Sequence, residues 1–316
     1  MTRQEILESR DALKRFCRDF NVPTATLDGF YFEKQLATLS MYSPHYLDLF
    51  EEYINELSTF PSIEAYFEHY NALKEAVISN ILNNEQFKQF SNSDIQCPKH
   101  YLKQELYKPT NDGFDFISID LRKANFTILE RYCPDLFSGK SWEEFLASFG
   151  ASSYLVKSKY LRQVIFGACN PKKQIQAETK LMIEIACKLE LQGYKIYSIT
   201  TDEILISVDP VDPVNISTLI TFINQELSYI SDKLKVEYFT LRKNLQGYEK
   251  VIIAGTDITS TTSVLKCIDS DVYCQVVKYY FHEYIDESDL VFDYKESLAR
   301  FFSPIENPFT DDLLGG

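Results

Sequence analysis

Two apolar stretches decide the fold, FDFISID at residues 114–120 and IYSITTDEILISV at residues 196–208. Both are rich in isoleucine, which alternates with small or polar residues, as is typical of β-strands. The first stretch ends in Asp120, and the second carries Asp202 and Glu203 in a tight turn. Carboxylates at neighbouring strand ends can hold two divalent cations a few ångströms apart, the arrangement used in phosphoryl transfer. The pattern therefore predicts a sheet whose acidic end binds cations.

The chain as a whole is expected to have an α+β fold in three parts. Residues 1–106 place apolar side chains at intervals of three and four between prolines, which predicts a helical domain. Residues 107–250 contain the two strands and amphipathic helices between them, which predicts an α+β domain. Residues 251–316 are expected to form a helical appendix that ends in an acidic tail.

Composition bears on the compartment. The 316 residues include seven cysteines without CxxC spacing, which indicates reduced thiols rather than disulfides or a zinc site. No apolar run approaches the roughly twenty residues that a membrane-spanning helix needs, and the chain opens on a polar helix rather than a signal peptide. We therefore expect no membrane partner and a cytoplasmic location, which for a viral protein is the host cytoplasm.

The net charge of −14 is unusual for a protein that acts on nucleic acid. Affinity for a phosphate backbone comes mainly from lysine and arginine, and here only the stretch 157–180 is locally basic. Two interpretations stay open. Either nucleic acid is held weakly and a protein partner supplies further affinity, or nucleic acid is not the ligand.

The segments between and around the acids occur in an order that can be compared with known families. They are DLRKANFTIL at 120–129, RQVIFG at 162–167, QIQA at 174–177 and TDE at 201–203, followed by an apolar strand that leads to Tyr248. In order and chemistry they resemble the palm and fingers of family A DNA polymerases, with the single-subunit phage RNA polymerases as more distant relatives. The resemblance covers about residues 107–250 and implies a polymerase-type palm sheet. The fingers are reduced to about residues 141–176, and residues 1–106 take the place of a thumb.

Four positions depart from the family pattern. Ser158 stands at the first arginine of the fingers helix, Asn170 and Pro171 replace a Tyr-Gly pair, and Thr201 replaces a histidine. The resemblance implies that the family residues at the places of Asn170 and Thr201 contact the primer terminus. The departures therefore imply weaker contacts there, and they favour a palm without activity as one alternative.

The resemblance assigns the metal site. Asp120 and Asp202 are expected to coordinate two magnesium ions, which manganese can replace, with the backbone carbonyl of Leu121 as a further ligand. Glu203 is implied as a supporting acid. The alternative is that strand-end aspartates only cap turns.

The resemblance also assigns the substrate contacts. Arg162 is expected to meet the triphosphate, and Phe166 with Gly167 to form the platform under the incoming base, a core phenylalanine being the alternative. Asn125 stands where DNA polymerases of the family have a glutamate that blocks the ribose 2′-hydroxyl, so the choice between DNA and RNA stays open. Contacts to nucleic acid are expected from Lys157, Lys159, Lys172, Lys173 and Gln176, with solvated side chains as the alternative.

These features lead to one principal hypothesis and two alternatives. The principal hypothesis is a magnesium-dependent nucleotidyltransferase, a template-directed polymerase of viral or plasmid type that uses nucleoside triphosphates, primer and template, and a protein partner. The first alternative is an inactive palm that serves as a binding or scaffold subunit of a replication or transcription complex. The second is a template-free nucleotidyltransferase or cyclase with the same two-metal chemistry.

Overall fold

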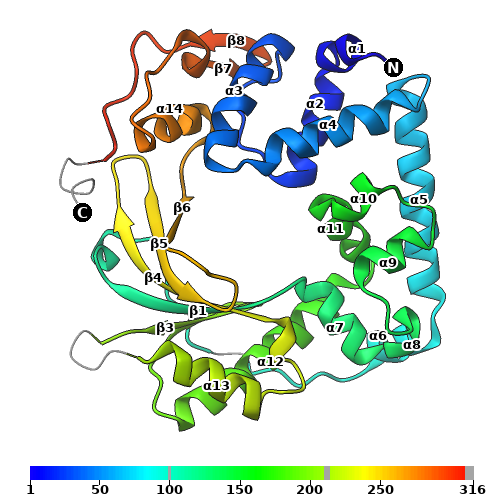
Figure 1. The fold of residues 1–316 in the computed structure, drawn as a ribbon. Helices are drawn as coiled ribbons and strands as arrows, with labels where there is room; N and C mark the ends of the chain where they lie inside the picture. Colours follow the sequence, from blue (N-terminus) through cyan, green and yellow to red (C-terminus); the bar gives the residue numbers. More distant parts are fainter. Residues whose placement is uncertain (99–100, 210–213, 310–316) are drawn as a thin grey trace.

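The computed structural model describes residues 1–98, 101–209 and 214–309. Its centre is a six-stranded sheet in the order β2-β3-β1-β4-β5-β6, in which every neighbouring pair is antiparallel. Figure 1 shows this sheet with helices below it and a ring of further helices around it. The strands are β1 (Asp115–Leu121), β2 (Ile196–Ile199), β3 (Glu203–Ser207), β4 (Leu234–Lys243), β5 (Tyr248–Gly255) and β6 (Thr262–Lys266). The predicted α+β class is confirmed.

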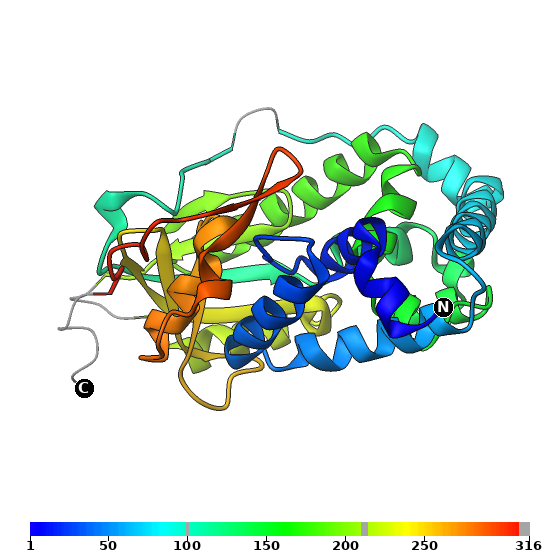
Figure 2. The same cartoon turned by 90° about the horizontal axis from the view of Figure 1, so that it is seen from above.

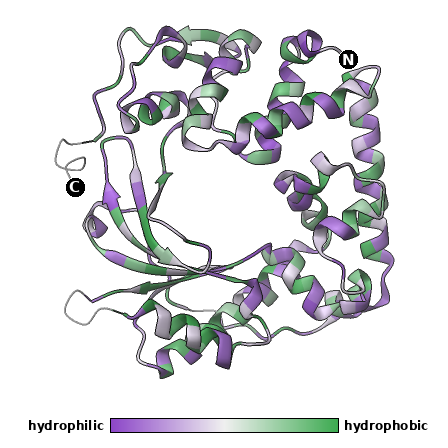
Figure 3. Ribbon diagram, in the orientation of Figure 1, coloured by the Kyte–Doolittle hydropathy of each residue, from purple (hydrophilic) through white to green (hydrophobic). Residues whose placement is uncertain are grey.

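The N-terminal part is helical, as expected. It comprises α1 (Arg3–Glu8), α2 (Arg10–Phe20), α3 (Gly29–Tyr42), α4 (His45–Ser58), α5 (Ile63–Asn83) and α6 (Glu85–Asn92). Figure 3 shows apolar and polar residues alternating along α5, the longest of these helices, whose buried residues recur at helical spacing. The first two helices are separated by a break at Ser9, whose hydroxyl caps α2 by accepting from the Ala12 N–H.

Seven α-helices lie between β1 and β4 among the residues that the structure describes. They are α7 (Ala124–Tyr132), α8 (Pro134–Phe137), α9 (Trp142–Ala147), α10 (Ser153–Lys157), α11 (Lys159–Gly167), α12 (Pro171–Leu191) and α13 (Ile216–Glu226). The expected fingers helix is thus two helices that meet at Ser158. Helix α12 begins three residues before the QIQA segment because Asn170 adopts a left-handed conformation and caps it from the side chain.

The two faces of the sheet differ. Ile117, Ile119 and Leu121 of β1 belong to the main apolar core together with residues of α7, α12 and α13, so these helices cover that side (Figure 1). Ser118 and Asp120 alternate with them and point to the opposite side, which we call the acid face. Glu203 of β3 pairs with Asp120 and lies on the same face. A second, smaller apolar cluster packs on the acid face farther from Asp120.

The C-terminal part differs from the expected helical appendix. The predicted boundary at residue 250 falls inside β5, and β6 adds a further strand to the sheet. Within residues 251–309, only α14 (Ser270–Tyr280) is a long helix. It is followed by a 3-10 turn, Glu287–Leu290, and a hairpin of β7 (Val291–Tyr294) and β8 (Ser297–Arg300). The expected acidic tail beyond residue 309 lies outside the described residues.

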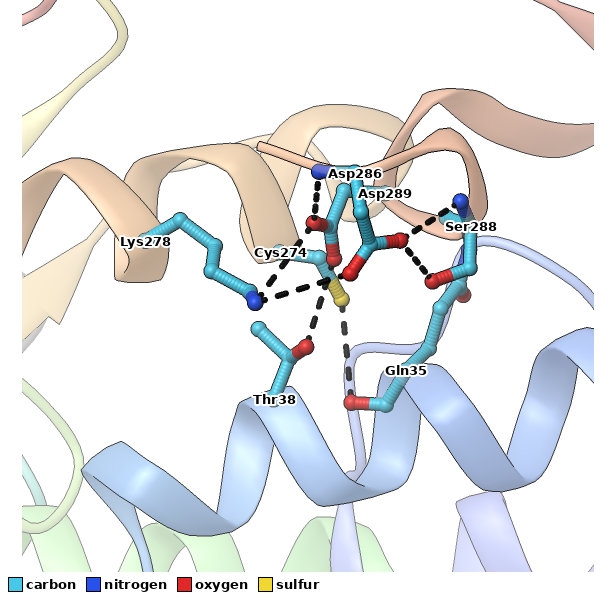
Figure 4. A network of polar contacts seen from close by, with 7 residues as sticks. All are labelled: Gln35, Thr38, Cys274, Lys278, Asp286, Ser288 and Asp289. Atoms are coloured by element: carbon cyan, nitrogen blue, oxygen red, sulfur yellow. Dashed lines mark hydrogen bonds and ion pairs between the residues drawn. The ribbon is translucent and has the colours of Figure 1, made fainter. Parts of the chain in front are cut away.

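The two ends of the chain pack against each other. Figures 1 and 2 agree that α14 and the hairpin lie beside α3, and Figure 4 shows the polar contacts that join them. The Gln35 side chain donates to the carbonyl oxygens of Ser288 (3.0 Å) and Val291 (2.8 Å), and Thr38 donates to Asp289 (3.2 Å). Asp289 is only 1% exposed. The helical domain and the C-terminal part therefore form one packed unit.

The N-terminal helices also hold α10 and α11, the helices that were expected to form the fingers. Asp19 of α2 is fully buried and accepts hydrogen bonds from the hydroxyls of Tyr154 (2.9 Å) and Ser158 (2.6 Å). Its carboxylate is ion-paired with Arg15 at 3.0 Å, and the Arg15 guanidinium lies 3.7 Å from the centre of the Tyr70 ring. Ser158, which stands at a family arginine, thus serves as a buried link between α11 and α2.

Candidate active site

The backbone brings the predicted acids to one end of the β1–β3 pair. Asp120 lies opposite Glu203 in the strand register, and the Leu121 N–H donates to the carbonyl oxygen of Asp202 at 2.8 Å. The β2–β3 turn is closed by Thr200, whose N–H donates to the Glu203 carbonyl oxygen at 2.8 Å. Asp202 is therefore held beside the end of β1, next to Leu121, as expected from the sequence.

The acids repel one another. Burial and, after it, the negative charges of Asp202 and Glu203 together raise the pKa of Asp120 to about 6, while Lys235 opposes the shift. Lys235 lies across from Asp120 on β4, but its ammonium group is also ion-paired with Glu237 at 2.5 Å. The positive charge of Lys235 is thus shared between Asp120 and Glu237. The acidic end of the sheet therefore favours binding of a further cation.

Glu203 has a local partner. The Ser118 hydroxyl, two residues before Asp120 on the same face, donates to Glu203 Oε1 at 2.7 Å. This bond fixes the Glu203 carboxylate beside Asp120 without neutralising it.

Glu178 is a further acid that sequence reasoning missed. It lies on α12, is 3% exposed, and accepts a hydrogen bond from Asn125 Nδ2 of α7 at 2.8 Å. Burial and, after it, the negative charge of Asp202 together raise its pKa to about 7, while the hydrogen bond from Asn125 opposes the shift. A signal was present: Glu178 falls one turn before Met182 on the apolar stripe of its helix, where a charge is out of place.

The small number of oxygen donors at this site limits how magnesium could bind. In the part of the chain that the structure describes, no group of three or more His, Cys, Asp or Glu side chains is arranged to hold a metal ion. Magnesium commonly takes one or two carboxylates and completes its shell with waters and substrate phosphates. Asp120, Asp202 and the carbonyl oxygen of Leu121 are hard oxygen donors of this kind, so the expected ions would bind together with a nucleotide.

Arg162 is available for an anion. It is half-buried on α11 and forms no ion pair with any described residue. Burial lowers its pKa, and nearby Glu143 opposes the shift. Glu143 is itself bound by the Lys123 ammonium group, with both oxygens at 2.7 Å. The guanidinium therefore keeps unfilled donors, which is what the expected triphosphate contact requires.

The neighbouring platform is not formed. Phe166 is 0% exposed, and its ring packs on Trp142 with the centroids 5.0 Å apart. A buried ring has no free face for a base, so the structure shows the alternative, a core phenylalanine, and corrects the prediction. Gly167 is exposed, and a side chain added there would meet nothing within 4 Å. Gly167 thus leaves room for a ligand, but sterics in this fold do not require a glycine.

The expected nucleic-acid contacts divide into two groups. Lys157 is bound to Glu52 of α4, with both oxygens at 2.7 Å, and Lys173 donates to the backbone carbonyl of Ser93. Lys159 and Lys172 are exposed and form no ion pair among the described residues. Gln176 is exposed as well. Its neighbour Gln174 is buried and binds the Phe166 carbonyl oxygen at 2.9 Å, so only the first of the two glutamines is structural.

Comparisons with known proteins give no match: no protein-family model, no curated protein and no solved structure is similar to the chain. The resemblance to family A polymerases therefore depends on the motifs and on the site geometry. Across residues 1–98, 101–209 and 214–309, no helix has both the length and the apolar character needed to cross a membrane.

Proposed function

We propose that the chain is a magnesium-dependent nucleotidyltransferase of polymerase type. The observation that carries the proposal is the meeting of Asp120 and Asp202 at the end of an antiparallel strand pair, where burial and like charge favour added cations. The antiparallel sheet with helices on one face agrees with a palm. The order of the surrounding motifs supports the same assignment.

Each residue has a distinct part in the proposed reaction. Asp120 and Asp202 would hold the two ions, which when bound would activate the attacking 3′-hydroxyl and stabilise the leaving pyrophosphate. The hydroxyl oxygen gives its proton to water and forms a bond to the α-phosphorus of a nucleoside triphosphate, while the bond from that phosphorus to the bridging oxygen breaks and pyrophosphate leaves. Glu203, held by Ser118, maintains the negative field beside Asp120. Arg162 neutralises charge on the triphosphate.

The test is extension of a primed template with nucleoside triphosphates and Mg²⁺ or Mn²⁺. Asp120→Asn and Asp202→Asn are expected to abolish transfer while the circular dichroism spectrum and the cooperative unfolding transition are retained. Asp232→Asn is the matched control, because Asp232 is exposed on the turn before β4. Full activity in either of the first two variants would exclude the proposed metal site.

A scaffold subunit is the second candidate. The net charge of −14 and the burial of Phe166 favour it, because both weaken contacts with nucleic acid and nucleotide. This candidate predicts that the chain forms a stable complex with a polymerase partner and that Asp120→Asn leaves the activity of the complex unchanged. An enzyme predicts that the same substitution inactivates the complex.

A further inference from the structure

Strand β4 carries two charged residues on the acid face, beside Asp120. Leu234 and Val236 belong to the main apolar core. Lys235 and Glu237 alternate with them along the strand and therefore point to the acid face. Lys235 lies directly opposite Asp120 in the register of β1 and β4, which are neighbours in the sheet (Figure 1). Side chains that face each other in this way have Cβ atoms about 5 Å apart. The flexible stem of Lys235 can therefore bring its ammonium group to either carboxylate, Asp120 or Glu237.

The ammonium group of Lys235 lies on Glu237 in the structure. Its nitrogen is 2.5 Å from Glu237 Oε1, and the ion pairs of the described residues include none between Lys235 and Asp120. Glu237 Oε2 accepts from the Lys250 ammonium group of β5 at 2.6 Å. Glu237 and Lys250 are each 7% exposed, and the Lys250 nitrogen lies 4.2 Å from the centre of the Phe239 ring. Breaking a buried pair of this kind is costly, so Lys250 keeps Glu237 in place, and Glu237 retains the more exposed Lys235.

The two positions within reach of Lys235 differ in what they leave for a metal ion. On Asp120, the ammonium group would occupy carboxylate lone pairs that a divalent cation needs, so that lysine and metal would compete. On Glu237, it leaves both oxygens of Asp120 open. Glu203 lies opposite Asp120 on the other side, so the acidic end attracts any nearby cation, Lys235 included. A contact that retains the lysine elsewhere therefore favours binding of the metal.

We propose that Glu237 is a positioning residue of the cation site, which holds the Lys235 ammonium group away from Asp120 and so keeps that carboxylate open to a divalent cation. Lys235 is then an internal competitor of the metal. This inference rests on the proposed function, because it takes Asp120 as a metal ligand. It predicts opposite effects of the two side chains: loss of Glu237 weakens cation binding, and loss of Lys235 strengthens it.

The first experiment measures binding of Mn²⁺ to the full chain by electron paramagnetic resonance, without primer and both with and without ATP. Asp120→Asn is the reference that lacks the site, so only binding that is lost in this variant is counted. Lys235→Met should tighten that binding about two- to fivefold, since a competing and partly exposed cation is removed. Lys243→Met, at the exposed far end of β4, is the control and should leave the affinity unchanged, because solvent and salt screen a distant charge.

The possible failures of this experiment are distinct. Equal Mn²⁺ binding by the parent and by Asp120→Asn would count against the proposed metal site itself, and the inference would fall with it. Unchanged affinity in Lys235→Met, with binding that still depends on Asp120, would overturn the inference alone and leave the proposed function standing.

The decisive comparison is Glu237→Gln in two backgrounds. In the parent it should weaken Mn²⁺ binding about fivefold, because Lys235 is released and pairs with Asp120. In Lys235→Met the same substitution should weaken binding less than about twofold, the effect of one lost negative charge at a distance. Equal weakening in both backgrounds would show that Glu237 acts only through its own charge or through packing, and would overturn the proposal.

Glu237→Gln combined with Lys250→Met provides a second route if the single variant does not fold. It removes the buried lysine together with the carboxylate, so that no unpaired charge stays buried. Lys235 is released as before, so Mn²⁺ binding should again weaken about fivefold, and addition of Lys235→Met should restore it. A folded double variant that binds Mn²⁺ as tightly as the parent would contradict the proposal.

Discussion

At the residue scale, the acidic site is a place where function would oppose stability. Asp120 and Glu178 both have a raised pKa, chiefly because they are buried, and neither has a cation of its own. For such groups the protonated form favours folding. Their contribution to stability is present below the unfolded pKa and is lost as pH rises through the folded value.

Asp120→Asn is therefore expected to stabilise the protein at pH 8 in EDTA. The pKa of Asp120 rises from 3.8 to about 6, and after allowance for its partial exposure we expect a gain of about 1–2 kcal/mol in unfolding free energy. The gain should vanish near pH 4, where the parent carboxyl is protonated as well. Urea unfolding at both pH values measures it. Magnesium at pH 8 should stabilise the parent more than the variant, and a gain that does not depend on pH would contradict this origin.

Arg162 gives a second prediction at this scale. If its guanidinium binds triphosphate, Arg162→Ala should raise the apparent KM for nucleotide and lower kcat, with kcat/KM falling about 10- to 100-fold, because a charge-assisted contact in the transition state is lost. Arg162→Lys should recover part of the loss. Arg131→Ala, an exposed cation on α7, is the control. Unchanged steady-state kinetics in Arg162→Ala would show that Arg162 is a helix cation without a part in the reaction.

The individual site residues were foreseeable to different degrees. Asp120 and Asp202 followed from strand periodicity, because a two-residue alternation fixes which side chains share a face. Phe166 could not be placed, since a helical aromatic looks the same in a core and under a ligand until its neighbour Trp142 is known. Glu178 was not foreseen as a site residue because its partner Asn125 is distant in the sequence. The hydrogen bond between the two side chains is known only from the fold.

At the element scale, the fingers helices are fastened to the N-terminal domain by buried polar groups. Asp19 links α2 to α10 and α11 through Tyr154 and Ser158, and all three side chains are buried. A rotation of α11 would have to break these bonds together. The reduced fingers are therefore expected to stay fixed relative to α2 during nucleotide binding.

Asp19→Asn should be strongly destabilising. It leaves the buried Arg15 guanidinium without its charge partner, and removal of one member of a buried pair costs about 3–5 kcal/mol. Glu51→Gln is the comparison: Glu51 is paired with Arg3 at the surface, and its loss should cost less than about 1 kcal/mol. Chemical denaturation of the three proteins measures both values. Similar small losses of unfolding free energy in the two variants would show that the Asp19 cluster adds little to stability.

The elements themselves were largely foreseeable, but their ends were less so. Apolar spacing located most strands and helices within a few residues. The break at Ser9 and the early start of α12 depend on side-chain caps, and a serine or an asparagine inside a helical pattern does not reveal whether it caps. Strand β6 was missed because its own sequence pattern does not indicate a strand. It is a strand because it pairs with β5.

At the scale of the whole molecule, the acidic charge and the arrangement of lysines limit contact with nucleic acid. Lys157 is occupied by Glu52, whereas Lys159 and Lys172 form no ion pair among the described residues. Binding of nucleic acid by the chain alone is therefore expected to be weak, to depend steeply on salt, and to need a basic partner for processive synthesis.

The lysines allow a graded test. Lys159→Ala and Lys172→Ala should each reduce the slope of log affinity against log salt by about one, while Lys157→Ala should change it little because that cation is already neutralised. Fluorescence anisotropy with a labelled primer–template between about 50 and 200 mM salt measures the slopes. Tight binding by the parent at physiological salt would contradict the charge argument, and equal effects of all three substitutions would contradict the assignment of Lys157.

The domain arrangement was the least foreseeable feature. The predicted boundary at residue 250 failed because the chain continues the sheet and then returns to α3. The bonds from Gln35 to Ser288 and Val291 span 253 and 256 residues, and no local pattern encodes such a contact. Sequence periodicity describes elements, whereas long-range pairing decides which elements form one unit.

That return contact has a consequence for biosynthesis. Helix α3 leaves the ribosome early, yet the groups that satisfy Gln35 and Thr38 are made some 250 residues later. At about 5–20 residues per second, the buried side of α3 waits roughly 10–50 s for its covering segment. During translation the N-terminal helices thus lack part of their final packing. A chain whose synthesis stops before residue 288 leaves the apolar surface of α3 uncovered. Such nascent chains are expected to be clients of chaperones, and fusions or truncations at the C-terminal end should affect the yield of folded protein more than the site chemistry does.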